Sequence, residues 1–346
     1  MQPFVFRSSV FALSAMAAAA ALPAAPARAD AAADFYRGKT LSVYVGVSPG
    51  GLYSTFAQLL GRHMAKHVPG APTIIIQHMP GAGGTKAAAF VYNAGPKDGS
   101  AVITPNAGID KRVVLKIGAP KYDPSKFHWL GGWGEAVNTL TVRSDAPVKT
   151  IEDAKTKIAV LGSLGKSSNT YMLPSLLNNL VGTKFKIVLG YRGGAPIRNA
   201  IEQGELHGWA GQWVGWKLAK PDWVRDGKLT HLVQMASKPS PELPGVPLLS
   251  SFARSDDERR IFEFVQTGIS DRAFVAPPGV PKDRLAALRT AYMTTLADPD
   301  FVAAATKSSY TVDPVQGATI QKFVEESMAM SPALVDRMRR AMGLEQ

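Results

Sequence analysis

Short apolar runs, glycine-rich breaks and helix-spaced apolar positions follow one another along most of the chain. In the first such unit, Leu41 to Val47 has an apolar residue at every second position, which predicts a buried strand. Ser48-Pro49-Gly50-Gly51 breaks that run, and the apolar residues from there to His67 recur at helical spacing. A strand, a glycine-rich turn and a helix in this order predict one unit of an α/β fold.

The same order recurs through the rest of the sequence. Further strands are predicted at 71–77, 100–104, 140–142, 158–161, 185–189, 209–212, 229–236 and at the start of 274–281. Helices are predicted at 86–92, 171–180, 282–296 and 320–342, and Thr150 is expected to be the N-cap of another. The proline-rich segment 238–247 is predicted to be a stiff connection outside either core.

Polar, glycine-rich loops follow most of the predicted strands. The carboxyl ends of parallel strands meet at one edge of a sheet, so the loops at 48–54, 81–85 and 105–108 are expected side by side. Residues 162–169 and 190–196 are two more polar, glycine-rich loops that follow predicted strands, in a second group of strands and helices. Free N–H groups and helix N-termini at such an edge attract anions. We therefore predict two lobes that face one cleft.

We expect the lobes to divide the chain as follows: residues 30–138 form the first lobe, 139–238 the second, and 239–346 return to the first lobe with the C-terminal helices.

The first 29 residues have the pattern of a secretory signal peptide. Arg7 supplies the basic start, the stretch from Val10 to Leu22 is apolar, and Ala27-Arg28-Ala29 offers the small residues of a cleavage site. We expect cleavage after Ala29 and a periplasmic location. The alternative is an uncleaved anchor, although the apolar stretch is short for a membrane span.

Composition narrows the chemistry further. The chain of 346 residues has no cysteine, which excludes a disulfide framework, a thiolate zinc site and a cysteine nucleophile. Its formal charge of +12 is dispersed and forms no basic arm, so it suits small anions better than a nucleic acid backbone. No motif predicts a cofactor.

One hydrolase motif is present, but it lacks a backbone N–H that the catalytic mechanism needs. Gly46-Val47-Ser48-Pro49-Gly50 matches the pattern G-x-S-x-G between a strand and a helix. The residue after the nucleophile must donate its N–H to the oxyanion, and Pro49 has no N–H. An exported serine hydrolase that uses Ser48 is therefore the alternative to a binding protein, and not the preferred interpretation.

Two other motifs are incomplete. The run from Gly162 to Ser167 resembles the end of a P-loop, but Val160 stands where the motif needs glycine. We interpret it as a polar, anion-facing loop. His63 and His67 are four residues apart without the glutamate of a zinc-protease helix, which favours a solvated helix face and predicts no metal.

Four of the six tryptophans lie within fifteen residues, at 209, 213, 216 and 223. Most of these positions are expected in a core. Trp213 follows a predicted strand, so it is a candidate to line the cleft and offer its ring to a ligand.

Several segments together resemble the solute receptors of tripartite tricarboxylate transporters, the Bug-type periplasmic binding proteins. The segments are 35–40 (FYRGKT), 49–51 (PGG), 79–84 (MPGAGG), 96–99 (PKDG), 191–195 (YRGGA) and 242–247 (ELPGVP). The resemblance extends over the whole chain after the leader, with the segments in the family's order.

The resemblance implies a non-enzymatic receptor of the two-lobed, type II Venus-flytrap fold that closes on a small organic acid. It implies that loops of both lobes hold the ligand through N–H groups, hydroxyls and ordered water. We expect Lys166 or Arg192 to add charge-assisted hydrogen bonds to the anion. With Asn106 in the third loop and Trp213, the candidate ligand-binding residues are Ser48, Pro49, Gly50, Gly51, Ser54, Gly83, Gly84, Thr85, Asn106, Ser163, Lys166, Ser167, Ser168, Arg192, Gly193, Gly194, Ala195 and Trp213.

The expected partners are the permease subunits of the membrane transporter, and the receptor is expected to be a monomer. Many relatives carry Asp at the position of Ser54, and without that acid an amino-acid ligand is disfavoured. A ligand sensor for a membrane signalling protein is a further alternative, because it would use the same binding chemistry.

Overall fold

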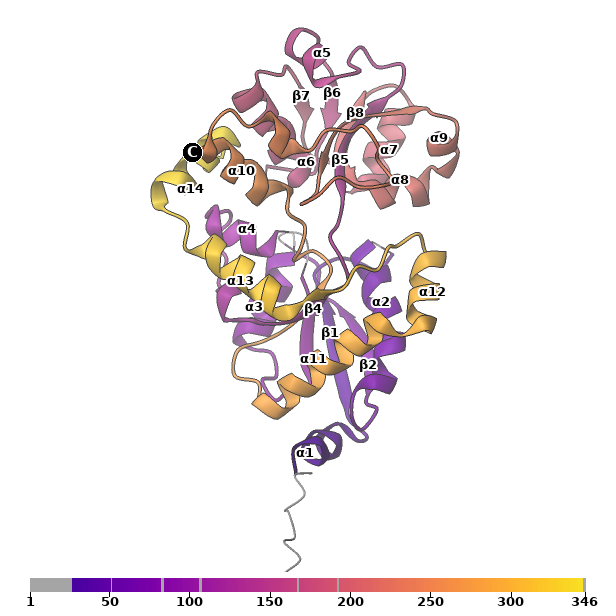
Figure 1. Cartoon of the computed structure of the whole chain (residues 1–346), viewed down its shortest axis with the longest axis vertical. Coiled ribbons are helices and arrows are strands. Elements are labelled where there is room, and N and C mark those ends of the chain that lie inside the picture. The colour runs from indigo at the N-terminus through magenta and orange to yellow at the C-terminus, as the bar shows by residue number, and fades with distance from the viewer. Residues whose placement is uncertain are drawn as a thin grey trace, which may run out of the picture.

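The computed structural model describes residues 27–344 except 51, 82–83, 106–107, 167 and 192, with side chains from residue 31 onward. The strands form two separate sheets, one in each of two lobes that lie end to end (Figure 1). Helices flank both sheets, so the predicted two-lobed α/β fold is confirmed. Within the described residues, no helix combines the length and the apolar character that crossing a membrane requires.

The first sheet has six strands in the order β11-β4-β10-β3-β1-β2. Their bounds are β1 (Thr40–Val45), β2 (Thr73–His78), β3 (Ala101–Thr104), β4 (His128–Gly132), β10 (Ala273–Ala276) and β11 (Val315–Gln316). β1 pairs in parallel with β2 and β3, whereas β10 and β11 pair antiparallel with their neighbours. Leu41 and Val43 pack into one helical layer and Tyr44 into the other, so β1 is buried on both faces.

Helices cover both faces of the first sheet. One face packs against α2 (Leu52–Met64), α11 (Lys282–Ala297) and α12 (Pro299–Lys307), and the other against α3 (Thr85–Asn93), α4 (Ile109–Val114) and α13 (Gly317–Met328). α1 (Ala27–Tyr36) packs against α11, and short 3₁₀ turns occupy Ala65–His67 and Pro124–Lys126. The predicted cleavage site lies in the first residues of α1, and the rest of the predicted leader lies outside the described residues.

The second sheet has five strands in the order β7-β6-β8-β5-β9. Their bounds are β5 (Asn138–Arg143), β6 (Val160–Gly162), β7 (Lys186–Val188), β8 (Gly208–Gln212) and β9 (Leu229–Met235). β6 pairs in parallel with β7 and β8, while β5 pairs antiparallel with β8 and β9. The carboxyl ends of β6, β7 and β8 therefore lie at one edge, which faces the first lobe.

Two clusters of side chains fill the second lobe. Its helices are α5 (Ile151–Thr156), α6 (Asn169–Leu176) with a π turn at Leu177–Val181, α7 (Gly194–Glu202), α8 (Trp213–Ala219), α9 (Pro221–Arg225), α10 (Asp256–Gln266) and α14 (Pro332–Ala341), with a 3₁₀ turn at Leu249–Phe252. The larger cluster joins α5, α6, α10 and α14, and the smaller one holds the tryptophans of β8 and α8. Thr150 caps α5 as predicted, because its hydroxyl accepts from the N–H of Asp153 at 3.0 Å.

Within the described residues, the chain passes between the lobes at 133–137, at 267–272 and at 329–331 (Figure 1). The sequence predicts that 239–346 returns to the first lobe in one piece. The packing differs from this expectation, because Phe262 of α10 and Val335 of α14 are buried in the core of the second lobe. The apolar spacing of an amphipathic helix predicts that one face is buried, but it does not determine in which lobe that face packs.

Two further expectations are wrong in detail. The terminal helix predicted at 320–342 is two helices, since α13 ends at Met328 and Ser331 caps α14, whose first residue is Pro332. The proline-rich segment is not separate from the cores, because Leu243 is buried with the tryptophans and Gln234 N–H donates to the carbonyl of Pro247 at 2.8 Å.

Candidate functional site

Strand register brings the predicted loops of each lobe together. In the first sheet Val45 lies opposite both His78 and Thr104, so the loops after β1, β2 and β3 leave from one edge. In the second sheet Gly162 lies opposite Val188 and Trp209, which aligns the ends of β6, β7 and β8. The side chains of Gln212 and Tyr53 approach to 3.5 Å across the gap, so the two edges face one another. We name this region the loop edge.

Several predicted residues lie at the loop edge in positions open to a ligand. Ser48, Pro49 and Gly50 are exposed after β1. Gly84 caps α3 with φ +94°, a backbone conformation that favours glycine, and Thr85 is the first residue of that helix. Five predicted residues, Gly51, Gly83, Asn106, Ser167 and Arg192, lie outside the described residues.

Ser54 is buried, and its hydroxyl is already engaged. Its Oγ lies 2.8 Å from His78 Nε2 and accepts from Gln58 Nε2 at 3.2 Å. This contact joins the start of α2 to the end of β2 and orients both loops. The sequence reasoning did not single out His78, although its position at the end of a predicted strand beside a glycine-rich loop was a usable signal.

Hydroxyls of the loop after β6 hold that loop together. Thr170 Oγ1 lies 2.9 Å from Ser163 Oγ and from Ser168 Oγ, and it accepts from the N–H of Leu164 at 3.0 Å. Ser163 is completely buried, so its predicted contact with a ligand would have to pass through its neighbours. Thr170, which the sequence reasoning missed, is the residue on which the network converges.

Lys166 differs from these serines because it is exposed. It lies with Lys116 and Arg339 around a cavity of about 220 Å³ between the loop after β6, the end of α4 and the end of α14. The lysine is thus free to turn toward an anion.

The loop after β7 leads directly into α7. Gly193 is the N-cap of that helix, and Gly194 and Ala195 form its first turn. A Cβ on Gly194 would lie 2.8 Å from the ring of Trp209, so glycine is required there by close packing as well as by any ligand. Ala195 is exposed.

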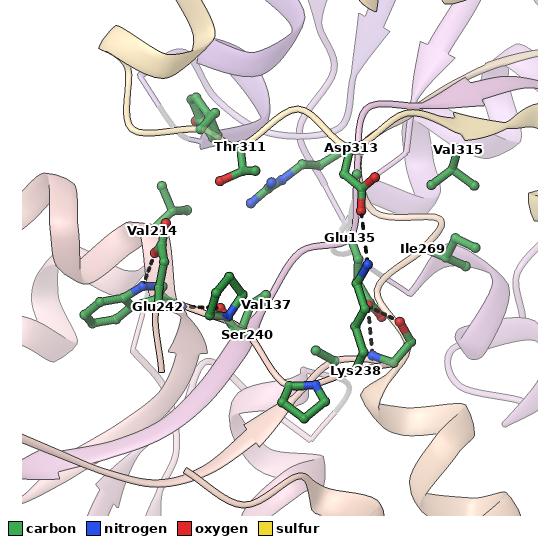
Figure 2. A pocket seen from close by; sticks show the side chains of 18 of the residues that line it. Glu135, Val137, Val214, Lys238, Ser240, Glu242, Ile269, Thr311, Asp313 and Val315 are labelled. Carbon is green, nitrogen blue, oxygen red and sulfur yellow. Dashed lines mark hydrogen bonds and ion pairs between the residues drawn. The ribbon is translucent and has the colours of Figure 1, made fainter. Parts of the chain in front are cut away.

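Trp213 is buried at the start of α8, and its indole N–H donates to the carboxylate of Glu242. Its ring meets the edge of His231 with centroids 4.8 Å apart, and burial lowers the pKa of His231 to about 4. Trp213 does line an opening between the lobes, but that opening is a second one, on the hinge side, with none of the other described candidate residues in its wall. We name it the hinge crevice (Figure 2).

One carboxylate ties the hinge segments together beside this crevice. Glu135 accepts from the N–H and the hydroxyl of Ser237 at 2.8 and 2.6 Å, and from the N–H of Gly268 at 3.0 Å. It therefore joins the first crossing to the end of β9 and to the second crossing. This role could not be predicted from the sequence, because the three segments are far apart along the chain.

Ser48, His63 and His67, which the sequence offers as motif residues, are placed as follows. Ser48 makes no hydrogen bond with a histidine in this part of the chain, and no group of three His, Asp or Glu side chains there could hold a metal ion. The expectation of a solvated face for His63 and His67 is wrong for His67, whose Nε2 lies 2.8 Å from Asp298. His63 packs its ring against Phe301.

Comparisons with known proteins agree on one family. The model of the tripartite tricarboxylate transporter family receptor matches residues 57–339. The solved periplasmic binding protein BugD is 20% identical, with a TM-score of 0.67, and the match covers 90% of this chain and 99% of BugD. No curated protein sequence matches.

Two similar structures contain ligands. MatC from Rhodopseudomonas palustris, solved with malate, is 23% identical with a TM-score of 0.65, covering 88% of this chain and 99% of MatC. A second R. palustris protein, solved with adipate, is 19% identical with a TM-score of 0.67, covering 88% and 97%. At these identities the structural likeness shows the fold.

Proposed function

The chain belongs to the family of tripartite tricarboxylate transporter receptors, and on this premise we propose that it is an exported, non-enzymatic receptor for a small carboxylate. The ligand binds at the loop edge, between the lobes. The receptor then delivers it to the permease subunits of a membrane transporter. One observation carries the proposal: strand register aligns the glycine-rich loops of both lobes at edges that face one another.

The chemistry of the loop edge supports an anionic ligand. Loop N–H groups and the N-termini of α2, α3, α6 and α7 present partial positive charge, and Lys166 adds a mobile cation. No acidic side chain stands among the candidate residues. The two similar structures solved with malate and adipate point to the same class of ligand.

Binding across the gap explains closure. A ligand that touches loops of both lobes binds the closed arrangement more tightly than the open one and shifts the population toward it. The contact between Gln212 and Tyr53 is a point at which the two lobes touch at the loop edge.

A thermal-shift panel tests the proposal. The purified protein is heated with malate, adipate, citrate and, as a control, their neutral amides. An acid at a hundred times its Kd should stabilise the fold by about 2.7 kcal/mol, which raises the melting temperature measurably. Absence of a shift with every acid, or ester turnover that Ser48→Ala abolishes, would contradict the proposal.

Lys166→Met provides a finer test by calorimetric titration. We expect several-fold weaker binding of the diacids, since an exposed charge contact contributes up to about 1 kcal/mol. Lys322→Met, on the exposed face of α13, is the matched control and should bind as the parent does.

Export is the remaining part of the proposal. If the leader is cleaved after Ala29, the protein recovered from the periplasm begins at Asp30. Intact-mass measurement decides this, because an uncleaved anchor would retain the mass of the first 29 residues.

A further inference from the structure

The hinge crevice is a cavity of about 320 Å³ that is separate from the loop edge. Thr311 and Asp313, from the segment before β11, stand on one side of it, and Val214 on α8 and Glu242 on the other (Figure 2). Val137 of the first crossing lines it as well, next to Ser240 in the view of Figure 2. The wall thus includes residues of both lobes and of the hinge.

Much of this wall is apolar. Its apolar members are Val137, Trp213, Val214, Pro239, Pro241, Ile269 and Val315. Apolar cavities of about 150 Å³ already admit benzene, so this crevice has room for an aromatic ring or a short aliphatic chain. A volume above 300 Å³ also reaches the range of natural ligand pockets.

Arg272 brings a buried charge to the crevice. Its side chain lines the cavity with 9% of its surface exposed, and its guanidinium lies over the ring of Tyr310 at 5.4 Å from the centroid. No hydrogen bond or ion pair joins that guanidinium to an acceptor in the described residues. Burial lowers the pKa of Arg272, while Tyr310, Tyr53 and Asp271 act in the opposite direction. A buried arginine without an acceptor is costly unless an anion completes it.

The other cations of the crevice are already paired. Lys217 Nζ lies 2.7 Å from a carboxylate oxygen of Glu242, and Lys238 lies 3.8 Å from Asp313 at the exposed rim. Within the described wall, Arg272 is therefore the cation with no carboxylate oxygen at hydrogen-bonding distance, and the buried Asp271 next to it in the chain acts on it only electrostatically. Beside it, the hydroxyl of Tyr310 is buried without a hydrogen bond.

We infer that the hinge crevice is a second ligand site, which binds a monocarboxylate with an aromatic or short aliphatic body. The carboxylate pairs with Arg272, and the apolar body lies against Val137, Val214 and Ile269. This site does not depend on the identity of the ligand at the loop edge. Because its occupant touches both lobes, its binding is coupled to their opening and closing.

The test uses 4-fluorobenzoate and ¹⁹F NMR titration of the purified protein. We expect saturable binding of 4-fluorobenzoate and at least about tenfold weaker binding of neutral 4-fluorobenzamide, because a hydrogen-bonded charge contributes about 1.5–3 kcal/mol. Arg272→Met should weaken the binding of 4-fluorobenzoate by about tenfold or more. Thr311→Trp, which fills the crevice and leaves the charge in place, should do the same.

Two variants serve as controls. Arg289→Met removes a partly buried arginine of α11 remote from the crevice, and Lys166→Met removes the cation of the loop edge. Both should bind 4-fluorobenzoate as the parent does. If Arg272→Met fails to fold, as circular dichroism would show, Thr311→Trp decides the question.

The inference fails if 4-fluorobenzoate does not bind, or if it binds with the same affinity in both crevice variants. It also fails if Lys166→Met alone weakens binding, since the probe then occupies the loop edge. Failure of the malate, adipate and citrate panel would remove the proposed function and leave this site standing.

Discussion

The loop edge and the hinge crevice both lie between the lobes, but different groups build them. At the loop edge, backbone N–H groups and helix termini supply partial charges, and the buried hydroxyls of Ser54 and Ser163 hold the loops in place. In and beside the crevice, the charged groups of Asp271 and Arg272 are buried, and the half-buried Glu135 lies at the hinge. The first region offers many weak dipoles to a ligand, and the second offers a few full charges.

This difference has an energetic consequence. Partial charges at a solvated edge cost little when no ligand is present, whereas buried ionised groups lose their hydration. Variants at the crevice should therefore change the free energy of unfolding and its pH dependence. Variants at the loop edge should act mainly through loop geometry and ligand affinity.

Substitution of Asp271 is expected to change the free energy of unfolding more than any other variant. The Asp271 side chain is buried, with 2% of its surface exposed. Burial, opposed by the nearby charges of Lys111 and Arg272 and supported by that of Asp110, raises its pKa to about 7. Between about pH 4 and pH 7 the folded state then holds a proton that the unfolded state has released, so stability falls as pH rises. Asp271→Asn should remove this fall and add on the order of 4 kcal/mol at pH 8, since each pKa unit corresponds to about 1.4 kcal/mol.

Urea unfolding of both proteins at several pH values measures this. Asp336→Asn, at an exposed position of α14, is the matched control and should leave the pH profile unchanged. An Asp271→Asn variant that is less stable at pH 8 would show that the carboxylate is ionised and paired with Lys111.

Thr170 tests the hydroxyl network of the loop edge. Thr170→Val keeps the shape of the side chain but leaves the N–H of Leu164 and the two serine hydroxyls without a shared partner. We expect a loss of about 1–2 kcal/mol in unfolding free energy and weaker binding of the diacid ligand. Thr306→Val, on the exposed face of α12, should lose less than about 0.5 kcal/mol. Equal losses in the two variants would contradict the role of Thr170.

Glu135 tests the tie between the hinge segments. In Glu135→Gln an amide nitrogen must replace one of the two carboxylate oxygens, each of which accepts from a backbone N–H. The expected loss is about 1 kcal/mol by urea unfolding, with a more open lobe arrangement by small-angle X-ray scattering. Glu263→Gln, whose side chain is exposed on α10, is the control. An unchanged scattering profile and stability would show that the tie does not restrain the lobes.

Ser54 gives the smallest expected change. Ser54→Ala removes the hydroxyl that joins His78 and Gln58, two groups that can turn to water. We expect a loss of about 0.5–1 kcal/mol and a few-fold weaker binding by calorimetry. Ser308→Ala, at the end of α12 and outside the candidate residues, should leave binding unchanged. Full affinity in Ser54→Ala would remove this serine from the positioning of the loops.

Local pattern was enough to predict most of the elements. Alternation from Leu41 to Val47 predicted β1, and the glycine-rich turns predicted where helices such as α3 and α6 begin. It failed where two elements of the same type follow each other, as at Ser331-Pro332, where one expected helix is two. Local pattern also could not assign α10 to a lobe. Amphipathic spacing shows that one face of a helix is buried, but it does not show which lobe that face packs against.

For the candidate site, sequence located the loops but not the side-chain contacts within them. The spacing of strands and turns determined the two-lobed α/β architecture and the gathering of glycine-rich loops, since both follow from local periodicity and from the sharing of one edge by parallel strands. Tertiary structure alone decided that Ser54 meets His78, that Glu135 joins Ser237 and Gly268, and that Arg272 faces a crevice without an acceptor. These contacts join residues distant in sequence, and burial in three dimensions sets their charge and hydrogen bonding.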